Sequence, residues 1–242
     1  MHGCFDELMD LFIAAKVDHG DRVILAGDLV DRGPNSLEVV RYAKTCGIEA
    51  VLGNHDEKHV RLRRHLKKRD AQPGYKVPMR PFTPSRQAQH DLLSDDDVAW
   101  IASLPVFLRF KDGEKDWLVV HGGMLAERPV EEQDPKIVIR CRWVEAETGY
   151  SISKSDPTVV PAGAVFWTER WKGPESVVYG HNVFPDRKPR YDRHGDVTCV
   201  GIDTGCCFGG TLTAAVFTGT GMPELVSVPA KKEHAVYGPA RD

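Results

Sequence analysis

The sequence has no long hydrophobic run and almost no excess of charge of either sign. No apolar stretch in its 242 residues approaches the about 20 residues that a transmembrane helix requires, so we expect no membrane partner. The net charge of −3 argues against a protein that coats nucleic acid through bulk charge, although it leaves room for a local basic patch. No linker divides the chain, so residues 1–242 are expected to form one catalytic domain.

The cysteines lack the paired spacing of a zinc site or a disulfide framework. They are Cys4, Cys46, Cys141, Cys199, Cys206 and Cys207, and most lie inside apolar segments. We interpret them as reduced core thiols in a reducing compartment, which favours an intracellular, cytoplasmic protein. Signal peptides, internal repeats and low-complexity tracts are not recognisable either.

A recurring unit organises the rest of the sequence: a short apolar run that ends in glycine and a residue able to bind metal. The main runs are Val23–Ala26, Ala50–Leu52, Trp117–Val120, Val177–Tyr179 and Val197–Ile202. Short β-branched runs bounded by glycine are typical of strands, and continuous rather than alternating hydrophobicity indicates strands covered on both faces.

Helical patterns fill the early intervals between these runs. Apolar residues recur at helical spacing over 5–13 and 36–46, and a capping box at Ser94 and Asp97 begins a third helix that ends before Pro105. Strands alternating with helices indicate an α/β fold. A turn between Phe107–Phe110 and Asp116–His121 predicts a hairpin, so part of the sheet is expected to be antiparallel.

Two segments show little periodicity. Residues 70–90 contain four prolines, which predicts a long surface loop of the kind that often serves as a lid or binding loop. Residues 230–242, after Pro229, are expected to form a loose tail.

Chemically capable side chains gather at the predicted strand ends. They are His2, Asp28, Asn54, His55, His121 and His181. Open α/β sheets place their sites beyond the carboxyl ends of strands, so these side chains are expected to converge. Oxygen and imidazole donors together suit manganese, iron or zinc, whereas an all-oxygen set would suit magnesium or calcium.

These residues carry a family resemblance. The segments 2–4 (HGC), 27–34 (GDLVDRGP), 53–56 (GNHD), 121–123 (HGG) and 180–181 (GH) are similar to motifs of the phosphoprotein-phosphatase branch of the calcineurin-like metallophosphoesterases. The resemblance extends from residue 2 to about residue 218. It implies a four-layer α/β sandwich, in which two mixed β-sheets are flanked by helices.

The resemblance also implies a metal centre with two divalent ions. One ion would be held by His2 and Asp28, and the second by Asp28, Asn54, His121 and His181. Manganese is the expected metal, with iron, zinc or cobalt as alternatives. Two ions held close together can orient a water for in-line attack on phosphorus and stabilise the developing charge.

Three further roles follow from the resemblance. His55 would be the general acid that protonates the leaving oxygen, and Asp31 would orient it through a hydrogen bond. Arg32 would bind the phosphate oxygens, a role that suits a guanidinium.

A second phosphate-binding arginine is usual in such sites. Arg140 and Arg142 are the candidates, because they alternate with apolar residues over 138–143 as if on one face of a strand. Arg170 is the reserve candidate. The alternative is that these are surface arginines stacked on neighbouring tryptophans.

The sequence combines features of two branches of this family. Residues 201–214 resemble the late motif of symmetrical diadenosine tetraphosphatases, which implies cleavage of diadenosine tetraphosphate to two ADP. Asp31, in contrast, matches protein Ser/Thr phosphatases, so a phosphoprotein substrate remains an alternative, as does the 5′ end of a capped RNA. The oligomeric state is not predicted.

The family's first ligand, an Asp two residues before His2 and carried on an apolar strand, has no counterpart in this sequence. Two interpretations remain open. Either the sequence begins inside a longer native chain, or one metal site lacks a ligand, which would favour a catalytically impaired phospholigand-binding pseudophosphatase.

A basic segment over residues 58–69 follows the His55 turn. It either forms a helix that attracts a polyanionic substrate, such as polyphosphate or RNA, or presents a solvated helix face.

Overall fold

A computed structural model of the chain describes residues 1–152 and 159–238. The described helices are α1 (Phe5–Ala14), α2 (Ser36–Thr45), α3 (Asn54–Ala71), α4 (Pro84–Leu92), α5 (Asp95–Ala102) and α6 (Pro135–Val138), with short 3-10 turns η1 (Val130–Glu132) and η2 (Trp167–Glu169). The strands are β1 (Ile24–Leu25), β2 (Glu49–Ala50), β3 (Phe107–Asp112), β4 (Lys115–Val120), β5 (Trp143–Glu145), β6 (Ala164–Phe166), β7 (Ser176–Tyr179), β8 (Arg190–His194), β9 (Val197–Gly201), β10 (Thr211–Val216) and β11 (Glu224–Pro229).

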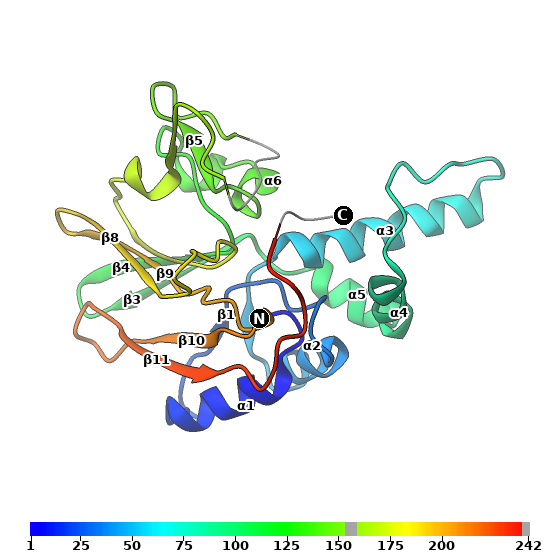
Figure 1. Cartoon of the computed structure of the whole chain (residues 1–242), viewed down its shortest axis with the longest axis horizontal. Coiled ribbons are helices and arrows are strands. Elements are labelled where there is room, and N and C mark those ends of the chain that lie inside the picture. The colour runs from blue at the N-terminus through cyan, green and yellow to red at the C-terminus, as the bar shows by residue number, and fades with distance from the viewer. Residues whose placement is uncertain (153–158, 239–242) are drawn as a thin grey trace.

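Two β layers form the centre of the molecule (Figure 1). One is a mixed sheet with the strand order β3-β4-β7-β9-β8, which includes the predicted antiparallel hairpin β3-β4. The other consists of the parallel pair β1-β2 and the antiparallel pair β10-β11. Between the layers lies an apolar core that includes Val51, Trp117, Val119, Val178 and Val200. Their burial explains why the strands read as continuous hydrophobic runs.

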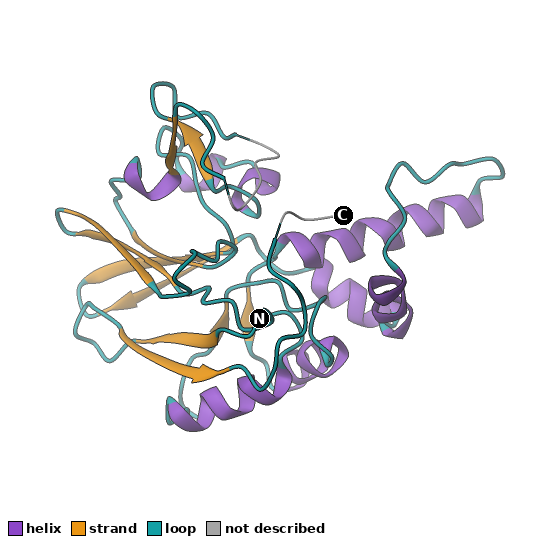
Figure 2. Ribbon diagram, in the orientation of Figure 1, coloured by secondary structure: helices purple, strands orange, loops and turns teal. Residues whose placement is uncertain are grey.

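Helical and irregular layers cover the two outer faces (Figure 2). Leu8 of α1, Val39 of α2 and Ile101 of α5 pack with Leu25 in a second core cluster. On the far side of the five-stranded sheet, Trp167 and Val138 pack against Leu118 and Tyr179. The predicted four-layer α/β sandwich is therefore confirmed, although its second sheet is divided into two strand pairs.

A slot of about 660 Å³ separates these two pairs, and residues 23–28 and 211–218 line it. β1 pairs with β2, and β10 pairs with β11. Apart from a bridge between Gly205 and Thr211, no other described strand is paired with β1 or β10.

The predicted loop over residues 70–90 is wrong in its second half, because α4 occupies Pro84–Leu92. Thr83 caps this helix by accepting a hydrogen bond from the Arg86 N–H, and Pro84 stands in the first turn, where its missing N–H costs nothing. The loop proper is confined to residues 72–83, because α3 extends to Ala71 and α4 begins at Pro84.

The strand predicted over residues 138–143 is also wrong. Asp134 and Pro135 begin the short helix α6, which ends at Val138, and β5 starts only at Trp143. Arg140 and Arg142 therefore lie on a connection rather than on one face of a strand.

The described residues after Pro229 make hydrogen bonds with the rest of the molecule. The Ala230 N–H donates to Gly210, and the Ala235 N–H donates to Cys207. The Tyr237 hydroxyl donates to the Val183 carbonyl at 2.8 Å. These contacts differ from the loose tail expected over 230–242, of which residues 239–242 lie outside the described residues.

In the described parts of the chain, none of the helices has the length and apolar character needed to cross a bilayer.

Candidate active site

Parallel strand pairing brings the predicted site residues to one edge of the sandwich. β1 is parallel to β2, and β4, β7 and β9 are parallel to one another, so the chain leaves these strands in matching directions. Asp28 follows β1, Asn54 and His55 follow β2, His121 follows β4, and His181 follows β7.

The turns after these strands are conformationally unusual. The φ angles of Asp28, Asp31 and Arg32 are 50°, 72° and 69°, and those of His2 and His181 are also positive. Positive φ is uncommon outside glycine and tends to cluster at functional sites. Glycine is required nearby as well, because a Cβ at Gly53 would stand 2.1 Å from the backbone nitrogen of Asp28.

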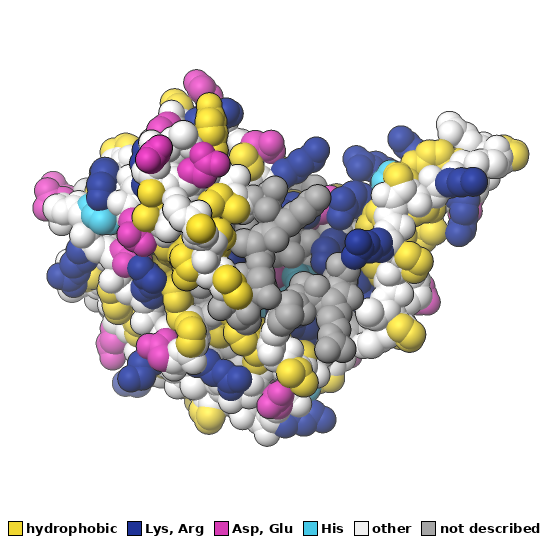
Figure 3. All heavy atoms as spheres, turned by 45° about the horizontal axis from the view of Figure 1, so that its top comes forward, with side chains coloured by type: hydrophobic (Ala, Val, Ile, Leu, Met, Phe, Trp, Pro, Cys, Tyr) yellow, Lys and Arg dark blue, Asp and Glu magenta, His cyan; other side chains and the backbone are white. Residues whose placement is uncertain are grey.

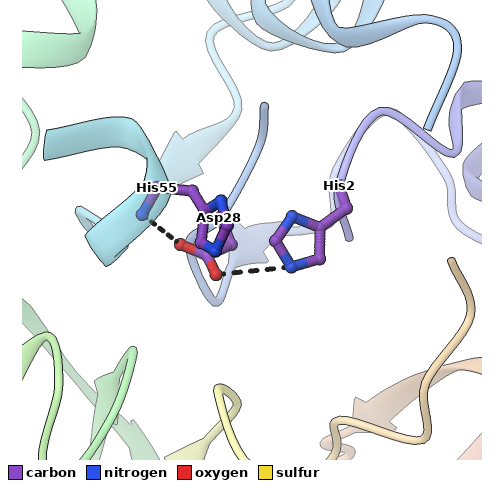
Figure 4. A group of neighbouring side chains, drawn as sticks. All are labelled: His2, Asp28 and His55. Atoms are coloured by element: carbon purple, nitrogen blue, oxygen red, sulfur yellow. Dashed lines mark hydrogen bonds and ion pairs between the residues drawn. The ribbon is translucent and has the colours of Figure 1, made fainter. Parts of the chain in front are cut away.

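Asp28 lies at the centre of the group (Figure 4). Its Oδ2 is 3.4 Å from His2 Nε2, and its Oδ1 is 3.3 Å from His121 Nε2. The backbone N–H of His55 donates to Oδ1 at 2.9 Å. Asp28 thus belongs to two groups of converging donor atoms, one with His2 and His55 and the other with His121 and His181.

The second group includes an amide oxygen. His121 Nε2 lies 3.2 Å from Asn54 Oδ1 and 3.2 Å from His181 Nδ1. Asn54 Oδ1 therefore lies beside the second group, and the sharing of one ion by these residues stays a prediction.

Backbone carbonyls orient three of the imidazoles. His2 Nδ1 is 2.9 Å from Val30 O, His121 Nδ1 is 2.8 Å from Ala26 O, and His181 Nε2 is 3.2 Å from Arg140 O. A carbonyl only accepts, so each of these nitrogens carries a hydrogen, and in the neutral ring the lone pair of the other nitrogen is left for a metal. That arrangement is typical of metal-binding histidines, and the donor set fits divalent cations.

Electrostatics favour the neutral, ligating form of two of these rings. Burial lowers the pKa of His2 well below its ordinary value, and the Arg32 charge lowers it further. Burial and the Arg142 charge lower the pKa of His181 in the same way.

His55 and Asp31 form the predicted pair. The His55 Nδ1–H donates to Asp31 Oδ2 at 2.5 Å, and both side chains are buried. With Nδ1 engaged, Nε2 is the His55 nitrogen left to exchange a proton with a substrate.

Three side chains that sequence reasoning missed also hold Asp31. His59 Nε2 donates to Asp31 Oδ1 at 2.8 Å, and Arg86 Nε donates to Asp31 Oδ2 at 2.7 Å. Gln89 accepts the Asp31 backbone N–H at 3.1 Å. Arg86 and Gln89 lie on α4, so recognising the Thr83–Pro84 helix start would have pointed to them.

Asp56 fixes the backbone around the centre. Its Oδ1 accepts the N–H groups of Leu29 and Val30, and its Oδ2 accepts that of Gly53. Burial and the nearby Asp28 charge raise the pKa of Asp56 to about 6. The last residue of the GNHD segment therefore organises both the β1 and β2 turns.

The arginine candidates are placed differently from one another. Arg32 donates to His2 Nε2 at 2.7 Å, and its guanidinium lies over the Phe208 ring. Arg142 is largely buried and donates to the His181 carbonyl at 3.3 Å, and no described residue accepts from its Nε. Arg140 is paired with Glu57 at 2.6 Å, while Arg170 is paired with Glu127, away from Asp28.

Lys and Arg side chains gather over α3, at the right of Figure 3. The predicted helix over 58–69 is confirmed as part of α3. Several of its cations are engaged in ion pairs: Arg63 and Lys67 with Asp95, and Arg61 with Glu57. Attraction of a polyanion by this face stays a prediction.

The fold and the donor set define a metallophosphoesterase. The calcineurin-like phosphoesterase family model matches residues 1–210, and the chain belongs to this family.

Two curated relatives are named as bis(5′-nucleosyl)-tetraphosphatases. The chain is 30% identical to the asymmetrical bis(5′-nucleosyl)-tetraphosphatase PrpE of Halalkalibacterium halodurans, over 96% of this chain and 92% of the relative. It is 28% identical to a symmetrical bis(5′-nucleosyl)-tetraphosphatase of Citrobacter koseri, over 88% and 87% of the two chains. A crystal structure described provisionally as a diadenosine tetraphosphatase superposes with a TM-score of 0.74 at 30% identity, covering 95% of this chain and 90% of that one.

Proposed function

We propose that the protein hydrolyses dinucleoside tetraphosphates with two divalent ions, manganese first, and cuts diadenosine tetraphosphate symmetrically into two ADP. The observation that carries the proposal is the position of Asp28, which is shared by two groups of converging donors beside the His55–Asp31 pair.

In the proposed reaction, different residues of the chain bind the metal ions, donate the proton and bind the phosphate. His2 and Asp28 would hold one ion, and Asp28, Asn54, His121 and His181 the other; bound divalent ions supply Lewis-acid activation of water and charge neutralisation. His55 gives a proton from Nε2 to the leaving phosphate oxygen, while Asp31 keeps the imidazole in the required tautomer and orientation. Arg32 binds the phosphate oxygens, with Arg142 as the second guanidinium.

The substrate class rests on likeness. Two relatives are named bis(5′-nucleosyl)-tetraphosphatases, one asymmetrical and one symmetrical. The 201–214 segment, which resembles the late motif of the symmetrical enzymes, supports cleavage to two ADP.

The test is a product analysis. Manganese-loaded protein is given diadenosine tetraphosphate, and the nucleotides released are separated and quantified. We expect two ADP per substrate, and a loss of about 10²–10⁴-fold in rate for His55→Ala, the range typical of a lost general acid. Arg193→Ala is the matched control, because Arg193 is exposed on β8 and belongs neither to the proposed site nor to the basic segment.

Each other outcome redirects the proposal. ATP and AMP would replace symmetrical with asymmetrical cleavage. Hydrolysis of an aryl phosphate alone would keep the chemistry and move the substrate toward phosphoproteins or RNA ends. No hydrolysis of either, together with one or no metal ion per chain, would favour a phospholigand-binding pseudophosphatase.

A further inference from the structure

We propose that α4 is a positioning element for the general acid: Arg86, assisted by His59 and Gln89, fixes the Asp31 carboxylate and through it the ring of His55. The inference rests on the proposed function, in which His55 donates the proton.

Every polar atom of Asp31 that faces the protein interior is engaged. Oδ1 accepts from His59, Oδ2 accepts from both His55 and Arg86, and the backbone N–H donates to Gln89. The residue is 2% exposed. A carboxylate bonded through both oxygens in different directions cannot rotate about its Cβ–Cγ bond, so the direction of the His55 hydrogen bond is fixed as well.

Arg86 places a permanent positive charge beside Asp31, whereas His55 and His59 are charged only when protonated. A buried carboxylate is costly unless it is paired and hydrogen-bonded. Arg86 is itself buried, at 9% exposure, and its Nη2 lies 3.2 Å from His55 Nδ1. Its guanidinium therefore touches both members of the pair that it positions.

The rest of the α4 face secures the turn that carries Asp31. Gln89 Nε2 donates to the Gly33 carbonyl at 3.0 Å, and its Oε1 accepts from Ser36 Oγ at 2.6 Å. His90 Nδ1 lies 3.1 Å from His59 Nδ1. Arg86, Gln89 and His90 are spaced i, i+3 and i+4, so one side of the helix faces the catalytic turn.

This turn needs external support. Asp31 and Arg32 both have left-handed backbone conformations, with φ of 72° and 69°. Such conformations are costly for residues other than glycine and persist only where the surroundings determine them. The contacts from α4 to Asp31 and Gly33 supply that determination.

A positioning role differs from a structural one in its dependence on the leaving group. An aryl phosphate with a good leaving group, such as p-nitrophenyl phosphate, needs little protonation, whereas phenyl phosphate needs more. Misplacing His55 should therefore slow phenyl phosphate hydrolysis more. A general loss of folded protein would slow both substrates equally.

The experiment compares Arg86→Met, Arg86→Lys and the control Arg193→Met, at an exposed position of β8, with the manganese-loaded wild type. For Arg86→Met we expect kcat on phenyl phosphate to fall about 10–100-fold, in line with a misplaced catalytic group, with KM little changed. The loss on p-nitrophenyl phosphate should be smaller. Arg86→Lys should recover part of the rate, and Arg193→Met should match wild type.

A double variant provides the decisive comparison. If Arg86 acts only through His55, Arg86→Met should add almost nothing to the loss already caused by His55→Ala. A full multiplicative loss in the double variant, or equal losses on the two aryl phosphates, would overturn the positioning role.

A spectroscopic readout separates this inference from the proposed function. The hydrogen-bonded Nδ1–H of His55 can be identified by NMR as the imidazole resonance missing from His55→Ala. Arg86→Met should shift or broaden it, and an unchanged resonance contradicts the inference. An inactive wild type that still shows the Arg86-dependent resonance would refute the proposed function and leave the positioning contact in place.

Discussion

At the scale of single residues, the site is assembled by groups that never meet the substrate. The carbonyls of Val30, Ala26 and Arg140 each select one nitrogen of an imidazole. Asp56 accepts hydrogen bonds from three backbone N–H groups of two turns. A sequence motif identifies the side chain that binds the metal. It does not identify the carbonyl that orients this side chain, because every residue type has the same backbone carbonyl.

The thiols give a prediction at the same scale. Burial raises the pKa of Cys141, Cys199 and Cys207 to about 12, whereas Cys46 is exposed at the end of α2. At neutral pH we expect one of the six thiols, that of Cys46, to react rapidly with a thiol reagent, and all six to react after unfolding. Cys46→Ser should remove the fast phase. Fast labelling of a second cysteine would show that the core opens locally.

At the scale of elements, local sequence predicted most helices and strands and missed α4 for a physical reason. The side chains that α4 buries are Arg86 and His90, so hydrophobic periodicity carries no signal there. Its partners lie in the turn at residues 31–33, more than fifty residues earlier in the chain. The prediction of a strand over 138–143 is wrong for a similar reason, because the apolar residues of a connection alternate like the inward face of a strand.

The helix α5 illustrates the opposite case, in which a local signal suffices. Ser94 Oγ accepts the Asp97 N–H at 3.1 Å, and the Ser94 N–H donates back to Asp97 Oδ2 at 3.0 Å, as the predicted capping box requires. We expect Ser94→Ala to lower the free energy of unfolding by about 1 kcal/mol at neutral pH, measured by urea denaturation. Ser85→Ala, at an exposed position of α4, should be close to neutral.

The same cap has a predictable pH dependence. Burial raises the pKa of Asp97, but hydrogen bonds from Ser94 and the charge of Arg41 outweigh it, so the net pKa lies below its ordinary value. A depressed carboxyl pKa gives stability that is complete above the unfolded-state value, about 3.9, and is lost as the pH falls through the folded-state value. The difference between wild type and Ser94→Ala should therefore shrink in acid. A constant difference would argue against an ionised Asp97 in the cap.

At the scale of the whole molecule, the site was predictable because topology does most of the positioning. Parallel strands of one sheet end at one edge, so Asp28 lies near Asn54, and His121 near His181, once the strands are recognised. The fine placement of the arginines was not predictable. Arg140 and Arg142 are two residues apart and both partly buried, yet one is paired with Glu57 and the other donates to the His181 carbonyl.

The slot between β1 and β10 gives the prediction that belongs to this scale. It is lined by apolar side chains of both β layers and α1, among them Leu8, Ile24 and Val178, and it reaches His2 and Asp28. An extended segment there would be covered on both faces and paired along its edges, and each apolar side chain it buries would contribute about 1.5–3 kcal/mol.

The slot can be tested with a variant that is extended ahead of Met1 by a short β-branched segment, with Asp placed two residues before His2. We expect this variant to unfold at a higher temperature and to bind manganese more tightly than the unextended chain. A version with Asn in place of that Asp should keep the thermal gain and lose the gain in affinity, since only the carboxylate adds an anionic donor beside His2. Thermal unfolding and manganese titration of the three chains measure both effects. Equal melting temperatures would show that the slot does not accept a strand, and equal affinities of the Asp and Asn versions would show that the carboxylate does not reach the metal site.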